Sequence, residues 1–449
     1  MKKVLATILA LVMAIGLCSV SWANAAEKEA SIGTVKYDTL AAAIAGAQNG
    51  ETVKLLKDIT VTASVQITAN KDVTLDLGTK TLTYSGDKTA ILCAGTLLLT
   101  NGKIVSTRGC GIGTSDNSTN AKITIEKSVT IEAQEMAVLT GKATGATITI
   151  EGGNFTAKDN AVIGGNGSER NGSANTIIIN DGIFNGGIVT DGYVACGIYA
   201  PWKDNITVNG GTFNITKGAG IVARAGIVTV NGGTFNCSGN VTGKVGDSRV
   251  VVPCSALVFD AEANYPGLAG DAKITATGGT FTAENGENSG CVATVGANTA
   301  SRVAVTGGTF SSDVSAYAPE GTPVATVVDG NVTSYCAVGS AVIAAAANNG
   351  KSVLVTKAGP VTGVDAGKSI AVADGVTGVT VNGVTVTGDS YTVPQPPRYY
   401  YNSTTTTTDT KTTDTKGSPK TFDAGIALYV GMALTSAAGV AFVGKKRED

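Results

Sequence analysis

The sequence predicts an all-β fold, a right-handed parallel β-helix with three sheets. It also predicts a short N-terminal capping helix and a small C-terminal β-rich module. Three observations lead to this prediction: a glycine-rich corner followed by phenylalanine recurs along the chain, an alternating apolar pair precedes each corner, and a small residue followed by an aliphatic one marks a third segment in every unit. Self-similarity at short intervals is typical of solenoids.

The corner unit is the strongest signal. Six of the nine phenylalanines end such a unit, within Gly152–Phe155, Asp181–Phe184, Gly210–Phe213, Gly232–Phe235, Gly278–Phe281 and Gly307–Phe310. Glycine adopts positive φ without strain, so it suits a tight corner between two strands. The recurrence predicts that the six aromatic rings occupy one internal column and stack on one another.

An apolar pair stands seven and five residues before each phenylalanine. The pairs are Ile148/Ile150, Ile177/Ile179, Ile206/Val208, Val228/Val230, Ile274/Ala276 and Val303/Val305; Leu97/Leu99 precede Ile104 in the same register, and Ile123/Ile125 precede Ile131 with one extra residue. A period of two predicts a strand with one buried face.

The third segment places a small residue before an aliphatic one. Its copies are Ala90-Ile91, Gly111-Ile112, Ala137-Val138, Ala161-Val162, Gly197-Ile198, Gly220-Ile221, Ala256-Leu257 and Cys291-Val292. Three short strands per unit, with length changes confined to other turns, favour a β-helix over residues 53–320. One or two coils should precede Leu97. An antiparallel sandwich is the alternative, because Gly-Gly also turns hairpins.

Both ends of this solenoid need capping elements, because the first and last coils would otherwise expose strand edges and the hydrophobic core. Residues 26–52 contain a predicted capping helix after Tyr37, with Asp38 or Thr39 as N-cap and Asn49-Gly50 as its end. A second copy of this opening appears at 335–393, with Ala344–Ala346 in its helix. We expect a small β-rich module there, either a C-terminal cap or a separate domain.

The helix and the strand Val53–Leu56 that follows it make residues 35–315 similar to the pectin-lyase-like superfamily. The resemblance implies a right-handed β-helix and raises polysaccharide lyase or glycosidase activity as a possibility. The motifs of those enzymes, Asn-Thr-Asp, Asp-Asp and His-Gly among them, do not occur in this sequence. Fold does not imply function, so any activity must be argued from a site.

The first residues have the pattern of a secretory leader. Lys2 and Lys3 precede an apolar run from Val4 to Val20, and Ala23-Asn24-Ala25 follows. This pattern predicts a signal peptide over 1–25, cleaved after Ala25. A retained N-terminal anchor is the alternative.

The last residues have the order of a sorting signal. The residues Ser418, Pro419, Lys420, Thr421, Phe422 and Asp423 precede an uncharged apolar span, 424–444, and the basic tail Lys445–Arg447. This order resembles the LPxTG-type sortase signal of Gram-positive surface proteins, in the variant with Ser or Asn first and Asp last; Ser418 and Phe422 are departures from the common form. The resemblance implies that a sortase cuts after Thr421 and joins the chain to the envelope.

The same resemblance places the protein on the cell wall of a Gram-positive bacterium, in the membrane only through the 424–444 span before sorting. A plain membrane anchor is the alternative. Between body and signal, the Pro- and Thr-rich residues 394–417 contain little that can be buried and predict a disordered wall spacer.

Composition excludes several kinds of chemistry. The 449 residues include no histidine, which removes Ser-His-Asp and Cys-His systems and imidazole metal sites. A formal net charge of -2 gives no electrostatic case for a nucleic-acid partner. Seven cysteines would remain after loss of Cys18 with the leader, and buried free thiols are the expected state. We expect neither a metal nor a cofactor.

Two groups of residues are candidates for a site. Asp260 and Glu262 are the best placed carboxylates for a glycosidase pair on an exposed face. Tyr193, Tyr199, Trp202 and Asp204 are the best candidates for an exposed glycan contact, because aromatic faces pack on sugar rings. In both cases an ordinary structural role is the competing interpretation.

The preferred functional hypothesis is a cell-wall-anchored, non-catalytic adhesin or glycan-binding display protein. Its partners would be the sortase and envelope, and an extended glycan or host-surface ligand. The alternative is a wall-attached polysaccharide lyase or glycoside hydrolase.

Overall fold

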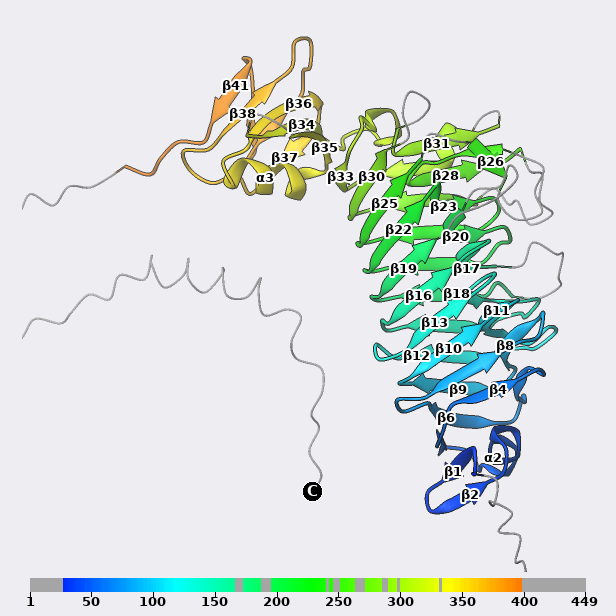
Figure 1. Ribbon diagram of the computed structural model, residues 1–449. Coiled ribbons are helices and arrows are strands. Elements are labelled where there is room, and N and C mark those ends of the chain that lie inside the picture. The colour runs from blue at the N-terminus through cyan, green and yellow to red at the C-terminus, as the bar shows by residue number, and fades with distance from the viewer. Residues whose placement is uncertain are drawn as a thin grey trace, which may run out of the picture. The chain divides into compact units, whose positions relative to one another are not determined.

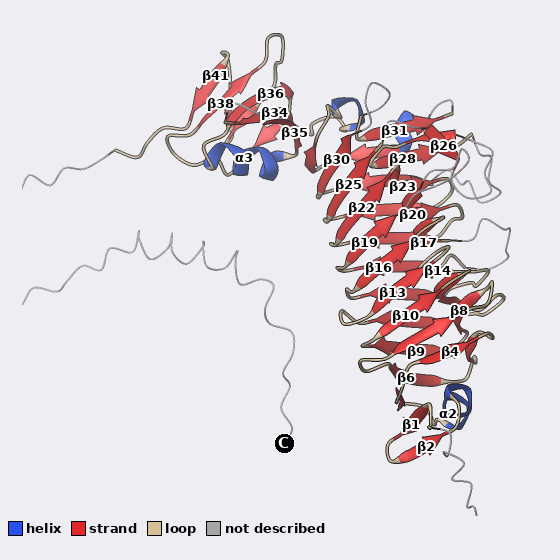
Figure 2. Cartoon of the chain, viewed as in Figure 1, coloured by secondary structure: helices blue, strands red, loops and turns tan. Residues whose placement is uncertain are grey.

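The computed structural model describes residues 27–397, apart from 166–172, 187–194, 240–241, 245–250, 263–270, 285–289, 297–298 and 331–332. The predicted signal peptide, most of the predicted wall spacer and the predicted sorting signal lie outside the described residues. Most of the described chain consists of short strands, and few helices are present (Figure 2). None of the described helices is long and apolar enough to cross a membrane.

Three sheets run along the stack of coils, and in each of them strands from successive coils are neighbours (Figure 1). Sheet A contains, in spatial order, β2 (Val35–Tyr37), β1 (Ala30–Ile32), β3 (Glu51–Leu55), β6 (Asp72–Asp76), β9 (Thr96–Thr100), β12 (Lys122–Ile125), β15 (Thr147–Ile150), β18 (Thr176–Ile179), β21 (Asn205–Val208), β24 (Ile227–Val230), β29 (Lys273–Ala276) and β32 (Val303–Val305).

Sheet B contains β4 (Ile59–Val61), β7 (Thr81–Tyr84), β10 (Lys103–Ser106), β13 (Thr130–Ala133), β16 (Asn154–Ala157), β19 (Ile183–Gly186), β22 (Thr212–Thr216), β25 (Thr234–Ser238), β30 (Thr280–Glu284) and β33 (Gly308–Phe310). It then continues through β35 (Thr333–Val338), β34 (Val324–Asp329), β36 (Ser352–Lys357), β38 (Ser369–Val372) and β41 (Ser390–Thr392).

Sheet C contains β5 (Val65–Ile67), β8 (Thr89–Cys93), β11 (Cys110–Thr114), β14 (Val138–Leu139), β17 (Ala161–Gly164), β20 (Ala195–Ala200), β23 (Gly218–Ala223), β28 (Leu257–Asp260) and β31 (Val292–Val295). Smaller pairings join β26 (Thr242–Lys244) to β27 (Val251–Pro253), and β37 (Pro360–Val361) to β39 (Thr380–Val381) and β40 (Val384–Thr385). Two 3₁₀ turns, η2 (Ala300–Arg302) and η3 (Ser315–Tyr317), complete the described elements.

Strand pairing between coils is parallel, which confirms the β-helix and excludes the antiparallel sandwich. The predicted apolar pairs are in register: Ile148 of β15 pairs with Ile177, Ile177 with Ile206, and Ile206 with Val228. Two parallel strands of sheet A, β3 and β6, precede β9, which carries Leu97. The expected one or two additional coils are therefore present.

The predicted aromatic column is also confirmed. From Phe155 to Phe310 the six rings stack in sequence, with centroids 4.4–5.2 Å apart and planes within 13°. The corner before each ring requires glycine: Gly211 has φ +95°, and a Cβ there would lie 3.0 Å from the carbonyl oxygen of Gly182 in the preceding coil. Coils are therefore close enough at this corner to exclude a side chain.

One register in sheet C differs from the prediction. Ile163, and not Val162, pairs with Val138 and Ile198. Val162 consequently takes the position that a small residue occupies in most coils. The prediction that Val162 is the aliphatic residue in register with Val138 and Ile198 is therefore wrong by one residue.

Helix α2 (Leu40–Gly46) caps the N-terminal end of the stack. Thr39 is the N-cap, since its hydroxyl accepts a hydrogen bond from the Ala42 amide, 3.1 Å away. Leu40, Ala43 and Ile44 join the solenoid core. The helix ends three residues before the predicted Asn49-Gly50 stop: Ala47 is already extended, and the Lys71 ammonium bonds to the carbonyls of Ala45 and Ala47.

The C-terminal module has its own hydrophobic core, built under helix α3 (Ser340–Asn348). It also continues sheet B, because β35 pairs with β33 in antiparallel orientation. The direction of pairing therefore reverses at the last coil. The module both forms a second core and covers β33, the last strand that the stacked coils contribute to sheet B.

Candidate functional site

The residues expected to contact a glycan are buried. Tyr199 is 4% exposed, Trp202 3% and Asp204 1%. Tyr193 lies outside the described residues. The expectation that these side chains form an exposed feature is therefore wrong for the three described members.

Asp204 forms hydrogen bonds with residues of neighbouring coils. It lies in the turn between β20 and β21, where its carboxylate accepts a hydrogen bond from the backbone amide of Asn175 (3.0 Å) and one from the hydroxyl of Thr140 (3.3 Å). Both donors come from earlier coils. These contacts give Asp204 a structural role in the turn.

Asp260 is also buried and forms an ion pair. Its Oδ2 lies 2.7 Å from Nε of Arg224, and both side chains are 0% exposed. Arg224 also donates from Nη1 to the Tyr199 hydroxyl, 2.7 Å away. Asp260 accepts a bond from the Glu262 amide as well, while Glu262 itself is exposed. Asp260 and Glu262 do not form a carboxylate pair on one exposed face, as a glycosidase would need.

A second apolar layer explains this burial. Ala161, Cys196, Tyr199, Ala219, Val222 and Val258, from four strands of sheet C, pack together with Val252 and Cys254 beside the β26–β27 hairpin. Side chains that would point to solvent on a bare solenoid are thus covered by the insertion between β25 and β28. A buried ion pair in such a layer gains much of its stability from its hydrogen bonds.

The seven cysteines of the described chain are free and buried, as expected. Burial raises the pKa of the Cys93, Cys110 and Cys196 thiols to about 12. Thiols in this state are protonated near neutral pH and do not act as nucleophiles. Within the described ranges, no three Cys, Asp or Glu residues are grouped to hold a metal ion.

The outward side of sheet B is mostly polar along its strands β16 to β33, and Ile183 of β19, 45% exposed between Asn154 and Thr212, interrupts it. We define the polar face as these polar outward residues, together with Ser311 directly after β33: Asn154, Thr156, Asn185, Thr212, Asn214, Thr234, Asn236, Thr280, Thr282, Thr309 and Ser311. Parallel register places them in columns, such as Asn185 beside Asn214 and Asn214 beside Asn236.

Asparagines on this surface form hydrogen-bonded ladders. In the face ladder, Nδ2 of Asn236 donates to Asn214 Oδ1 (3.0 Å), and Nδ2 of Asn214 donates to Asn185 Oδ1 (3.1 Å). A second, corner ladder of Asn180, Asn209 and Asn231 repeats the pattern at the Gly-Gly corner with 2.9 Å bonds. The sequence signal for the face ladder was the Phe-Asn dipeptide in three successive units, which the sequence analysis did not use.

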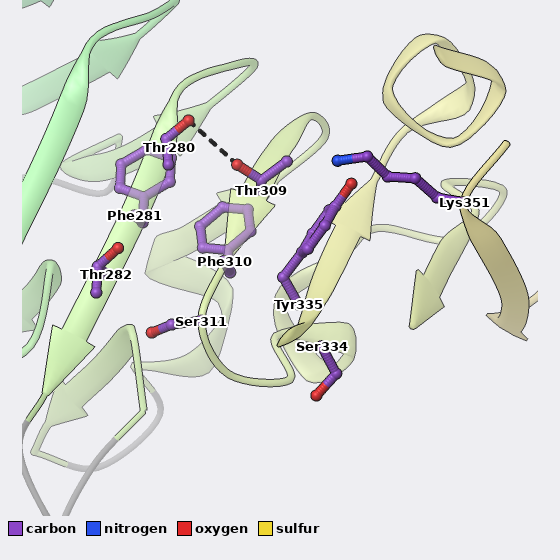
Figure 3. A pocket seen from close by; sticks show the side chains of 9 residues that line it. All are labelled: Thr280, Phe281, Thr282, Thr309, Phe310, Ser311, Ser334, Tyr335 and Lys351. Atoms are coloured by element: carbon purple, nitrogen blue, oxygen red, sulfur yellow. Dashed lines mark hydrogen bonds between the residues drawn. The ribbon is translucent and has the colours of Figure 1, made fainter. Parts of the chain in front are cut away.

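A cavity of about 440 Å³ lies where the polar face meets the C-terminal module (Figure 3). It is lined by Thr280, Phe281, Thr282, Thr309, Phe310, Ser311, Ser334, Tyr335 and Lys351. Sequence analysis missed Tyr335 and Lys351, because only the pairing of β35 with β33 brings them beside the solenoid.

The chain matches no protein-family model, no curated protein and no solved structure. Its function is therefore inferred from its own residues.

Proposed function

We propose that this protein is an exported, cell-wall-anchored surface protein of a Gram-positive bacterium that binds an extended, hydroxyl-rich glycan along its polar face. The leader at 1–25 and the sortase-type signal at 418–449 support export and attachment. The resemblance of residues 35–315 to the pectin-lyase-like superfamily, many of whose members act on polysaccharides, also supports a glycan ligand.

The face ladder is the observation that carries the glycan proposal. A side-chain amide has two N–H donors and two acceptor lone pairs. Asn214 uses one N–H toward Asn185 and one lone pair toward Asn236. One N–H and one lone pair of Asn214, the interior member, remain, and the two outer asparagines also keep unused groups, so the ladder presents donors and acceptors at the coil spacing. Such an array suits a chain of hydroxyl groups lying along the stack.

The buried state of Asp260 leaves the lyase or hydrolase alternative without its best carboxylate pair. We therefore propose binding without turnover.

The binding test uses the fragment 27–417, which contains both hydrophobic cores, on an array of plant, fungal and bacterial polysaccharides. Replacing Asn185, Asn214 and Asn236 together by Ala should weaken binding by tenfold or more, since each lost hydrogen bond contributes about 1 kcal/mol. The matched control replaces the corner ladder, Asn180, Asn209 and Asn231, by Ala. Equal losses in the two triple variants, or no polysaccharide bound at all, would contradict the proposal.

Turnover is checked on every polysaccharide that binds, by assays for new reducing ends and for unsaturated products. Release of products by the wild-type fragment, lost in Glu262→Gln, would instead establish the enzymatic alternative.

The attachment test follows the full chain in cell fractions. Thr421→Ala should leave the protein in the membrane fraction or the medium, whereas Lys420→Ala, at the variable position of the motif, should stay covalently bound to the wall. Wall-bound Thr421→Ala protein would refute sortase anchoring.

A further inference from the structure

The cavity between the polar face and the C-terminal module has the size and lining of a small-ligand site. Its volume of about 440 Å³ lies within the range of such pockets. Two strands of the last coils, β30 and β33, supply one wall, and β35 with Lys351 supplies the other. Because β33 is the last strand that the stacked coils contribute to sheet B, the cavity stands at the end of the polar face.

Tyr335 provides an aromatic wall. Its side chain is partly buried against the module core, and the Lys351 ammonium lies 5.3 Å from the ring centroid. Figure 3 shows the ring between Lys351 on one side and Thr309 and Phe310 on the other. The ring face opposite Lys351 is therefore the face turned toward the solenoid strands that line the cavity.

Hydroxyl-bearing side chains line the same, mostly apolar cavity. Thr309 donates to the Thr280 hydroxyl at 3.2 Å, and Thr282, Ser311 and Ser334 complete the polar part of the lining. An apolar ring face with several hydroxyls around it is the combination that recognises a sugar, whose C–H groups pack on the ring while its hydroxyls form hydrogen bonds.

The charges at the site cancel. Lys351 is 2.8 Å from the Asp329 carboxylate, and this hydrogen bond is the main cause of a raised Lys351 pKa. The ammonium is thus already matched by a carboxylate. A uronic acid or phosphate would find no net positive charge here, so the site favours a neutral sugar.

From these contacts we infer that the cavity is an end subsite for one neutral sugar ring of the bound glycan, with Tyr335 as its stacking platform. This inference rests on the proposed glycan-binding function and adds the class of sugar and the residue that holds it. The ring at the end of a glycan lying on the polar face would enter the cavity as its last contact.

The test measures binding of short oligosaccharides of neutral hexoses and N-acetylhexosamines, and of uronic acids, to the 27–417 fragment by calorimetry. Neutral oligosaccharides should bind, and Tyr335→Ala should lower their affinity about three- to tenfold, the loss expected for one stacking contact. Tyr335→Phe keeps the ring and should retain affinity, which separates stacking from a folding defect. Tyr391→Ala is the matched control, because Tyr391 packs against the same module core on β41 and does not line the cavity.

The outcomes separate this inference from the proposed function. If polysaccharide binds and depends on the face ladder, but Tyr335→Ala is unchanged, the subsite is refuted and the proposed function stands. Preferential binding of uronic acids would also overturn the subsite as assigned. If neither polysaccharides nor oligosaccharides bind, both the subsite and the proposed function are refuted.

Discussion

Phe213 lies inside the aromatic column and is the best position at which to measure what ring stacking contributes to this fold. Its ring centroid is 4.4 Å from Phe184 and 4.5 Å from Phe235, and it is fully buried. Phe310, at the end of the column, is equally buried but stacks on Phe281 alone, at 4.6 Å. The same substitution at both positions removes two ring pairs in one case and one in the other.

Each ring pair contributes about 0.5–1.5 kcal/mol beyond the area it buries. Phe213→Leu should therefore lose about 1–3 kcal/mol of stacking free energy, and Phe310→Leu about 0.5–1.5 kcal/mol. The change in buried volume is the same at both sites, so it cancels in the comparison. Phe213→Leu should be the less stable variant by about 0.5–1.5 kcal/mol, the value of one pair.

The assay is equilibrium urea unfolding of the 27–417 fragment, followed by circular dichroism. Coils of a solenoid contact only their neighbours and can unfold in separate steps, so both variants must show the same number of transitions as wild type before their free energies of unfolding are compared. Equal losses at the two sites would refute a stabilising role for the stacked rings and reduce the column to ordinary core packing.

Three further predictions follow from buried groups and from the helix cap. Arg224→Met removes the ion-pair partner of the buried Asp260 carboxylate and should lower the free energy of unfolding by about 3–5 kcal/mol. Adding Asp260→Leu should restore part of this loss in the urea assay, and a double variant no more stable than the single one would contradict the prediction. Thr39→Ala removes the N-cap hydrogen bond of α2 and should reduce the free energy of unfolding by about 1 kcal/mol in the same urea assay. An unchanged midpoint of the urea unfolding curve would show that the cap does not stabilise the fold. The Cys93 and Cys196 thiols, with pKa raised from 9.0 to about 12, stay protonated in the native state at pH values where the unfolded chain releases protons. The free energy of unfolding should therefore fall as pH rises from 9.0 toward about 12. A thiol reagent at pH 8 should label these two cysteines only after denaturation, as counted by mass spectrometry. Rapid labelling of the native protein would be incompatible with their burial.

The stacked core was predictable because its signal is repeated. A single Gly-x-Phe segment is ambiguous, but six copies with an apolar pair at constant distance leave one register in which like residues stack. The error at Val162 arose where a coil places a large residue at the small-residue position, so the local pattern pointed one residue away from the true pairing.

The buried state of Trp202, Tyr199 and Asp260 was not predicted, because it depends on contacts between distant segments. Alternation along a strand tells which side chains face the solenoid axis, but not whether an insertion covers the other face. A usable signal was nevertheless present. Strands β20 and β23 contain almost only small and apolar residues, and strands buried on both faces have such continuous runs.

The hydrogen-bonded ladders of the polar face and the cavity at its end were not predicted. The ladders require the register that the structure supplies. Tyr335 reaches the cavity because β35 pairs in reverse with β33, and nothing in the local sequence of either strand specifies that partner.

The constancy of the aromatic column has a consequence for how the molecule can diversify. The chain between Phe235 and Phe281 is about twice as long as that between Phe213 and Phe235, yet the two ring pairs are stacked alike, at 5.2 and 4.5 Å. The extra residues are divided between two turns, one between β25 and β28 and one between β28 and β29, and the rings on either side remain stacked. Lineages could therefore exchange whole surface loops, and engineers could graft foreign epitopes, at these two turns while the scaffold beneath keeps its spacing.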